Sequence, residues 1–122
     1  MAYPGNASEP EIRAQHELVA NSDLADGSFL ATYRFTFTNP GSNDIEMVSV
    51  RFLTSIGIII DPEPIEFAVG SIAAGQSISQ LREILSFAPG MAFSMFLGHG
   101  EGIEASGQVV SFGVFSLRGG IK

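Results

Sequence analysis

The chain has 122 residues, of which 45% are apolar and 16% charged, and it contains no cysteine. This length fits one domain with a sizeable core, and the lack of cysteine excludes a disulfide framework, a thiolate zinc site and a cysteine nucleophile. Thirteen acidic residues against six basic ones give a net charge of −7, which argues against nucleic acid as a partner because the phosphates would repel this surface.

The first fifteen residues are polar and include Pro4, Gly5 and Pro10. We therefore expect residues 1–15 to form an extended N-terminal arm and residues 16–122 to form the folded domain. The most apolar stretch, Val48 to Ile60, is 13 residues long and contains Arg51. That is too short to cross a bilayer, so no membrane span is expected.

The clearest strand signal begins near Ser28. Tyr33, Phe35 and Phe37 alternate with polar residues, a pattern typical of a half-buried strand. Turn-forming residues follow at 39–44, and the alternation resumes over 45–53. These features predict two strands paired as an antiparallel hairpin.

Further strands are expected along the rest of the chain. The stretch 77–88 is ambiguous, because Leu81, Ile84, Leu85 and Ala88 follow helical spacing while the residues around them favour a strand; we predict a strand. The segment from Val109 to Leu117 is apolar on both faces, which indicates a central strand or one covered by a partner. The other expected strands lie at 56–60, 65–69 and 91–97.

Seven or eight short strands, with turn signals every eight to twelve residues and no convincing helix, define the fold class. The sequence predicts an all-β protein, a single antiparallel immunoglobulin-like β-sandwich.

The sequence contains no recognisable catalytic motif. There are two histidines, His16 and His99, and we expect His99 to lie in an exposed glycine-rich turn at 98–102. The histidines do not have the spacing of a zinc-binding motif. The segment Gly75 to Ser79 is not a nucleophile elbow, because it lacks the final glycine of that motif. The protein is predicted not to be an enzyme.

Four carboxylates form the candidate metal set. Asp61 and Glu63 lie beside prolines, while Glu101 and Glu104 are expected in a later turn. Loops of a sandwich converge at its ends, so these oxygens are candidate ligands for calcium. The favoured interpretation is that they are solvated acids that keep the protein soluble, and no other cofactor is expected.

The surface lacks the residues that usually protect sheet edges. Lys122 is the only lysine, and the chain has more large apolar residues than a small sandwich can bury. We therefore expect an edge or face to be covered by another copy or by the N-terminal arm of a neighbour. The candidate interface residues are Ile58, Ile60, Phe96, Phe115 and Leu117.

Several segments carry a resemblance to a known class of proteins: Tyr33 to Ser42, Gly70 to Ser77, Ser86 to Gly90 and Val110 to Val114. Their strand and turn pattern resembles bacterial immunoglobulin-like modules and is similar to exported cell-surface proteins of the PEP-CTERM type. The resemblance implies a sandwich outside the cytoplasm with a structural or adhesive role, and it supplies no catalytic residues.

The predicted function is that of a non-catalytic, secreted or cell-surface module that self-assembles into a homo-oligomer or binds a protein or glycan partner. Two alternatives stay open. One is a small ligand-binding module, assisted by calcium, that recognises a glycan or protein through its acidic loops. The other is a proteinase-inhibitor-like sandwich that presents one loop.

Overall fold

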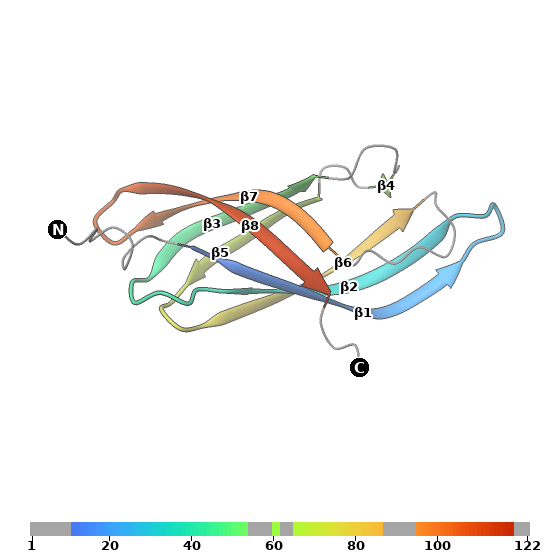
Figure 1. Ribbon diagram of the computed structural model, residues 1–122, viewed down its shortest axis with the longest axis horizontal. Helices are drawn as coiled ribbons and strands as arrows, with labels where there is room; N and C mark the ends of the chain where they lie inside the picture. Colours follow the sequence, from blue (N-terminus) through green and yellow to red (C-terminus); the bar gives the residue numbers. More distant parts are fainter. Residues whose placement is uncertain (1–10, 54–59, 62–64, 87–94, 119–122) are drawn as a thin grey trace.

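A computed structural model describes residues 11–53, 60–61, 65–86 and 95–118, and every regular element in them is a strand (Figure 1). For Ile60, Asp61, Met95, Leu117 and Arg118 it describes the backbone only. In chain order the strands are β1 (Arg13–Asp23), β2 (Phe29–Thr38), β3 (Ile45–Leu53), β4 (Ile60–Asp61), β5 (Ile65–Ile72), β6 (Ser77–Ser86), β7 (Met95–Glu104) and β8 (Val109–Arg118).

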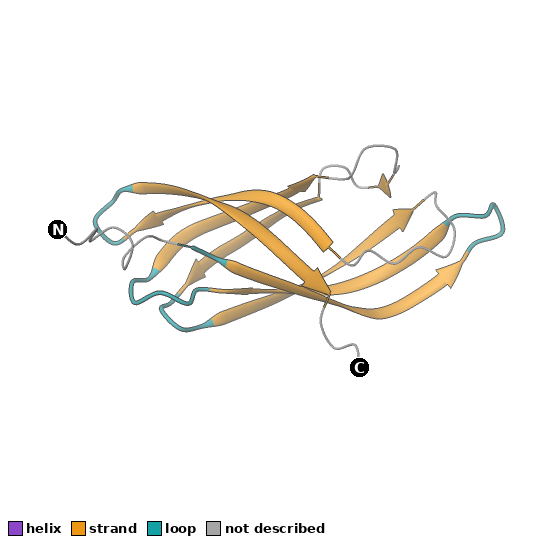
Figure 2. Cartoon of the chain, viewed as in Figure 1, coloured by secondary structure: helices purple, strands orange, loops and turns teal. Residues whose placement is uncertain are grey.

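Hydrogen bonds join the strands in the order β4-β6-β2-β1-β8-β7-β3-β5. This sheet folds into two layers, one made of β4, β6, β2 and β1 and the other of β8, β7, β3 and β5 (Figure 2). The layers join where β1 runs parallel to β8 over Ala14 to His16, and all other described pairings are antiparallel. The predicted class, an all-β immunoglobulin-like sandwich, is confirmed.

Aromatic side chains fill the space between the layers. Tyr33, Phe35 and Phe37 of β2 are fully buried, as the alternation of that strand predicts. The ring of Phe35 lies within 5.8 Å, centroid to centroid, of the rings of Phe52, Phe67 and Phe96 from the opposite layer. Packing of this kind adds to the free energy gained from burying the rings themselves.

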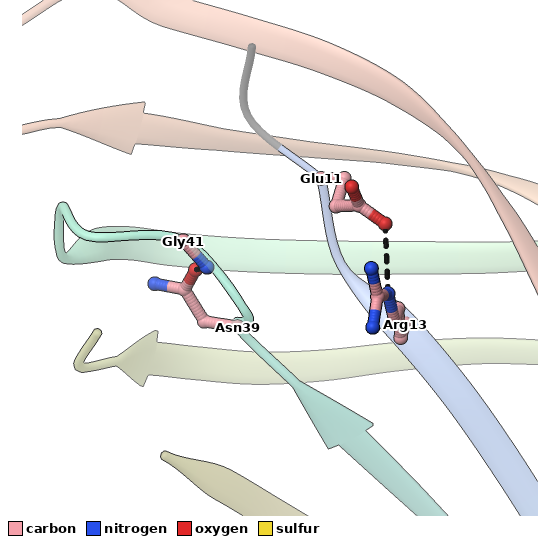
Figure 3. Close-up of polar contacts among 4 residues, drawn as sticks. All are labelled: Glu11, Arg13, Asn39 and Gly41. Atoms are coloured by element: carbon pink, nitrogen blue, oxygen red, sulfur yellow. Dashed lines mark hydrogen bonds and ion pairs between the residues drawn. The ribbon is translucent and has the colours of Figure 1, made fainter. Parts of the chain in front are cut away.

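The predicted hairpin of residues 28–53 is wrong. β2 pairs with β1 and β6, whereas β3 pairs with β5 and β7, so the connection at 39–44 crosses between the layers. Asn39 fixes this crossing. Its side-chain NH2 donates to the carbonyls of Asn43 and Ile72. Its side-chain oxygen accepts from the Gly41 N–H (Figure 3).

β1 is a strand that the sequence pattern does not show. Only His16 of its eleven residues is buried, so the strand lacks the apolar alternation by which the others are found. Backbone pairing with β2 along nearly its whole length holds it in place. β1 begins three residues before the expected domain start at residue 16, and Ile12 ahead of it is also buried.

Other predicted strands are confirmed, whereas residues 56–59 and 91–94 of the remaining expected strands lie outside the described residues. The ambiguous segment 77–88 is a strand over Ser77–Ser86, since it pairs with β2 residue for residue. The segment that is apolar on both faces is β8, which lies centrally between β1 and β7. No helix of the described residues is long and apolar enough to cross a membrane.

Candidate binding face of β3, β7 and β8

Three large apolar side chains lie in line across the outer face of the second layer. Leu53 of β3 is opposite Leu97 of β7, and Leu97 is opposite Phe115 of β8. Leu53 is 62% exposed, Leu97 55% and Phe115 46%. We call these three residues the apolar row.

A second line of residues, two positions along each strand, carries polar side chains on β3 and β7 and none on β8. It contains Arg51 of β3, His99 of β7 and Gly113 of β8, which are again opposite one another. The Arg51 guanidinium forms an ion pair with Glu66 of β5 at 2.7 Å, and His99 Nε2 lies 4.0 Å from a carboxylate oxygen of Glu101. These groups are exposed, so the pairs orient side chains more than they stabilise the fold.

Beside the apolar row the face is hollowed. A groove of about 830 Å³ is lined by residues of β3, β5 and β7, and Arg82 of β6 closes one side. Ser49, Glu66 and Glu101 contribute acceptor oxygens, while Arg51 and Arg82 contribute guanidinium donors. Such a groove can hold a polar ligand or the polar rim of a protein partner.

The side chains of Arg82 and Gln80 also connect β6 to β5, the edge strand of the other layer. Their side-chain nitrogens donate to the backbone carbonyls of Glu66 and Ala68 on β5, at 3.3 and 3.2 Å. The Arg82 guanidinium lies 4.5 Å from the centre of the Phe67 ring, a cation–π contact. These side chains therefore protect an edge that no backbone ladder covers in the described residues.

The glycine-rich segment 98–102 was predicted to be a turn, and this prediction is wrong. The segment is the middle of β7. Its glycines face inward, where there is no room for a side chain. A Cβ at Gly100 would collide with the Phe112 ring, and one at Gly102 would collide with Ile45. His99 and Glu101 alternate with these glycines and so point outward from a rigid strand.

The predicted interface residues have different outcomes. Phe96 is only 3% exposed, so its expected place on a surface is wrong: its ring packs against His16 and Tyr33 in the core. Phe115 is exposed and belongs to the apolar row. Ile58 lies outside the described residues. Ile60 and Leu117 lie in β4 and β8, and their side chains are outside the described part.

The predicted calcium ligands that the structure describes are divided between two strands. Asp61 is in β4, Glu63 is outside the described residues, and Glu101 and Glu104 are both in β7 rather than in a turn. In the described part of the chain, no three His, Asp or Glu side chains are grouped closely enough to hold a metal ion. The calcium site stays a prediction.

His16 is a buried polar residue whose role the sequence did not indicate. Its Nδ1 lies 2.6 Å from the Ser116 hydroxyl, and the ring packs among Tyr33, Phe35 and Phe96. Both His16 and Ser116 are inaccessible to solvent, so the pair ties β1 to β8 at the place where the two layers join.

No family model and no curated protein matches the chain. Solved structures do. A target of the Northeast Structural Genomics Consortium, SoR45, aligns with a TM-score of 0.50 at 11% identity, over 96% of this chain and 91% of that one. The CARDB domain of the PF1109 protein of Pyrococcus furiosus aligns in a solution structure at 13% identity with a TM-score of 0.43, over 88% of this chain and 95% of that one.

A crystal structure of the same CARDB domain, in complex with di-metal ions, gives 15% identity and a TM-score of 0.42, over 88% of this chain and 89% of that one. Identities this low show the fold alone. The strand order and the two layers define the class of the protein, an immunoglobulin-like sandwich, and the resemblance to PEP-CTERM proteins stays a prediction.

Proposed function

We propose that this chain is a non-catalytic module that works outside the cytoplasm by docking a protein partner on the apolar row and its polar surroundings. The observation that carries the proposal is the alignment of Leu53, Leu97 and Phe115 on three adjacent strands, all exposed. Scattered exposed leucines are ordinary, whereas a contiguous apolar patch with a polar rim is typical of an interaction site.

The surroundings of the row suit such an interface. On one side of the row the face is polar, with Ser49, Glu101 and Ser111 four positions away along the strands, and polar groups at the rim are typical of protein interfaces. The row also lies on central strands, whose backbones are held from both sides, so the surface is rigid before it binds. A location outside the cytoplasm agrees with a surface that has almost no lysine.

The groove favours a second candidate function, the binding of a small polar ligand such as a glycan. Its paired guanidinium and carboxylate groups could bind several hydroxyl groups at once. We rank this function second because no exposed Phe, Tyr or Trp ring lines the groove to stack against a sugar, among the residues that the structure describes.

The proposal requires that the apolar row be dispensable for folding. We expect Leu53→Thr and Leu97→Thr to change the free energy of unfolding by no more than about 0.5 kcal/mol, since threonine suits a strand and the positions are exposed. The control Val50→Thr places a hydroxyl in the core beneath and should cost about 1–3 kcal/mol. Urea unfolding measures all three. A loss for the row variants as large as that of the control would show that the row serves the fold, and would contradict the proposal.

A further inference from the structure

We propose that the partner docked on the apolar row is a second copy of this chain, related by a two-fold axis that seats Phe115 of each copy over Gly113 of the other. This inference rests on the proposed function and names its partner. Two observations support it. The exposed ring of Phe115 and the open position at Gly113 lie next to each other on one face of β8, and the charges of that face balance.

Phe115 and Gly113 point to the same side of β8, because exposed and buried residues alternate from Ser111 to Ser116. The Phe115 ring projects from the face with 46% of the residue exposed. At Gly113 the strand carries no side chain and the space above it is open, since a Cβ placed there would meet no atom within 4 Å; this gap between the side chains of Ser111 and Phe115 is what we call the hollow. A ring and a hollow of this kind, two residues apart, make a surface that can fit itself.

A two-fold axis lying in the interface, perpendicular to β8 and midway between these two residues, exchanges the ring of one copy with the hollow of the other. Such an isologous contact uses one patch twice. The cross-strand pairs of β7 and β3 follow the same operation, so Leu97 faces His99 of the other copy and Leu53 faces Arg51. The alkyl stem of an arginine and the imidazole ring both cover apolar surface while their polar ends reach water.

The charge of the face favours a copy over an oppositely charged protein. The chain as a whole carries −7, so two copies repel each other over most of their surfaces. Next to the apolar row, however, Arg51 of β3 and Glu101 of β7 carry opposite charges that balance each other. A neutral patch on an acidic protein is the place where a second acidic copy meets least repulsion, whereas a basic partner would gain nothing from it.

The size of the face limits the affinity. Three strands about 4.8 Å apart and about 33 Å long present roughly 500 Å² per copy, which is below the area of a standard stable interface. The dimer should therefore dissociate on dilution, and the experiment must cover a wide range of concentration.

Two substitutions test the fit of ring and hollow. Gly113→Leu fills the hollow, and it should be tolerated by the monomer because the space is open and the backbone there is not left-handed. Phe115→Ser removes the ring. The control, Leu81→Ser, removes an apolar side chain of similar exposure from β6 in the other layer.

Sedimentation velocity over a hundredfold range of protein concentration gives the result. We expect wild type and Leu81→Ser to shift from monomer to dimer alike, and each of the two face variants to dimerise at least tenfold more weakly. An equimolar mixture of the two face variants should regain dimer, since the new leucine occupies the space of the missing ring while the other ring keeps its hollow. Circular dichroism checks that every variant is folded.

A wild-type protein that stays monomeric throughout, face variants that dimerise like wild type, or a mixture that gains no dimer would overturn the inference. The proposed function fails on a different result, a core-like loss of stability in the Leu53 and Leu97 variants. The two failures are therefore distinguishable.

Discussion

Asn39 decides where the chain leaves one layer for the other. Its backbone pairs with Gln76 and Gly75, and its side chain reaches the Ile72 carbonyl, 33 residues away. The sequence Asn39 to Asp44 correctly predicts a break in the strand, because these residues favour turns. It does not predict what the turn connects, since the contacts that Asn39 makes outside the turn go to Ile72 at the end of β5 and to Gly75 and Gln76 in the connection after it.

Asp26 shapes the turn between β1 and β2 and gives the fold a dependence on pH. Its carboxylate accepts from the Ser28 hydroxyl at 2.5 Å and the Ser28 N–H at 3.0 Å. These two bonds lower the pKa of Asp26 below 3.8 in the folded protein. The stabilisation is therefore present above that pH and is lost as the pH falls through the lower, folded pKa.

We expect Asp26→Ala to be less stable than wild type near neutral pH and the difference to narrow as the pH falls below 3.8. Urea midpoints across the acid range measure this. Ser28→Ala, which removes the hydroxyl donor, should weaken the same pH dependence. A difference between Asp26→Ala and wild type that stays constant down to the acid limit would contradict the account.

At the scale of elements, the strands with regular apolar alternation were predictable and the others were not. β2 is found at once because Tyr33, Phe35 and Phe37 all enter the core. β1 is missed because a strand held by its neighbours' backbones needs no apolar alternation. β7 is misplaced for the opposite reason: its inward positions are glycines, which usually mark turns but here make room for Phe112 and Ile45.

A glycine-to-alanine substitution should lower the stability of the protein on the inner face of this layer and leave it unchanged on the outer face. Gly100→Ala puts a methyl group into the Phe112 ring and should cost about 1–3 kcal/mol of unfolding free energy. Gly113→Ala, on the adjacent strand, enters open space and should be neutral to within about 0.5 kcal/mol. Thermal or urea unfolding compares them. Equal losses would mean that β7 does not pack its glycines inward.

At the scale of the whole molecule, the fold class follows from the number of strands and the turn spacing, but the order of the strands does not. The wrong hairpin of β2 with β3 shows why: alternation tells which residues are buried, and not which strand lies beside them. The binding face, too, could be predicted only in part from the sequence. Phe115 was a candidate, whereas Leu53 and Leu97 join it only because β3, β7 and β8 are neighbours.

The central claim is that the outer face of β3, β7 and β8 is the surface through which this protein associates. The most direct test is to record the backbone amide NMR spectrum of the labelled protein while its concentration is raised. We expect shifts that grow with concentration and cluster around Leu53, Leu97, Gly113 and Phe115, with β2 and β6 unaffected. Shifts centred on β6, or a spectrum that does not change with concentration, would contradict it.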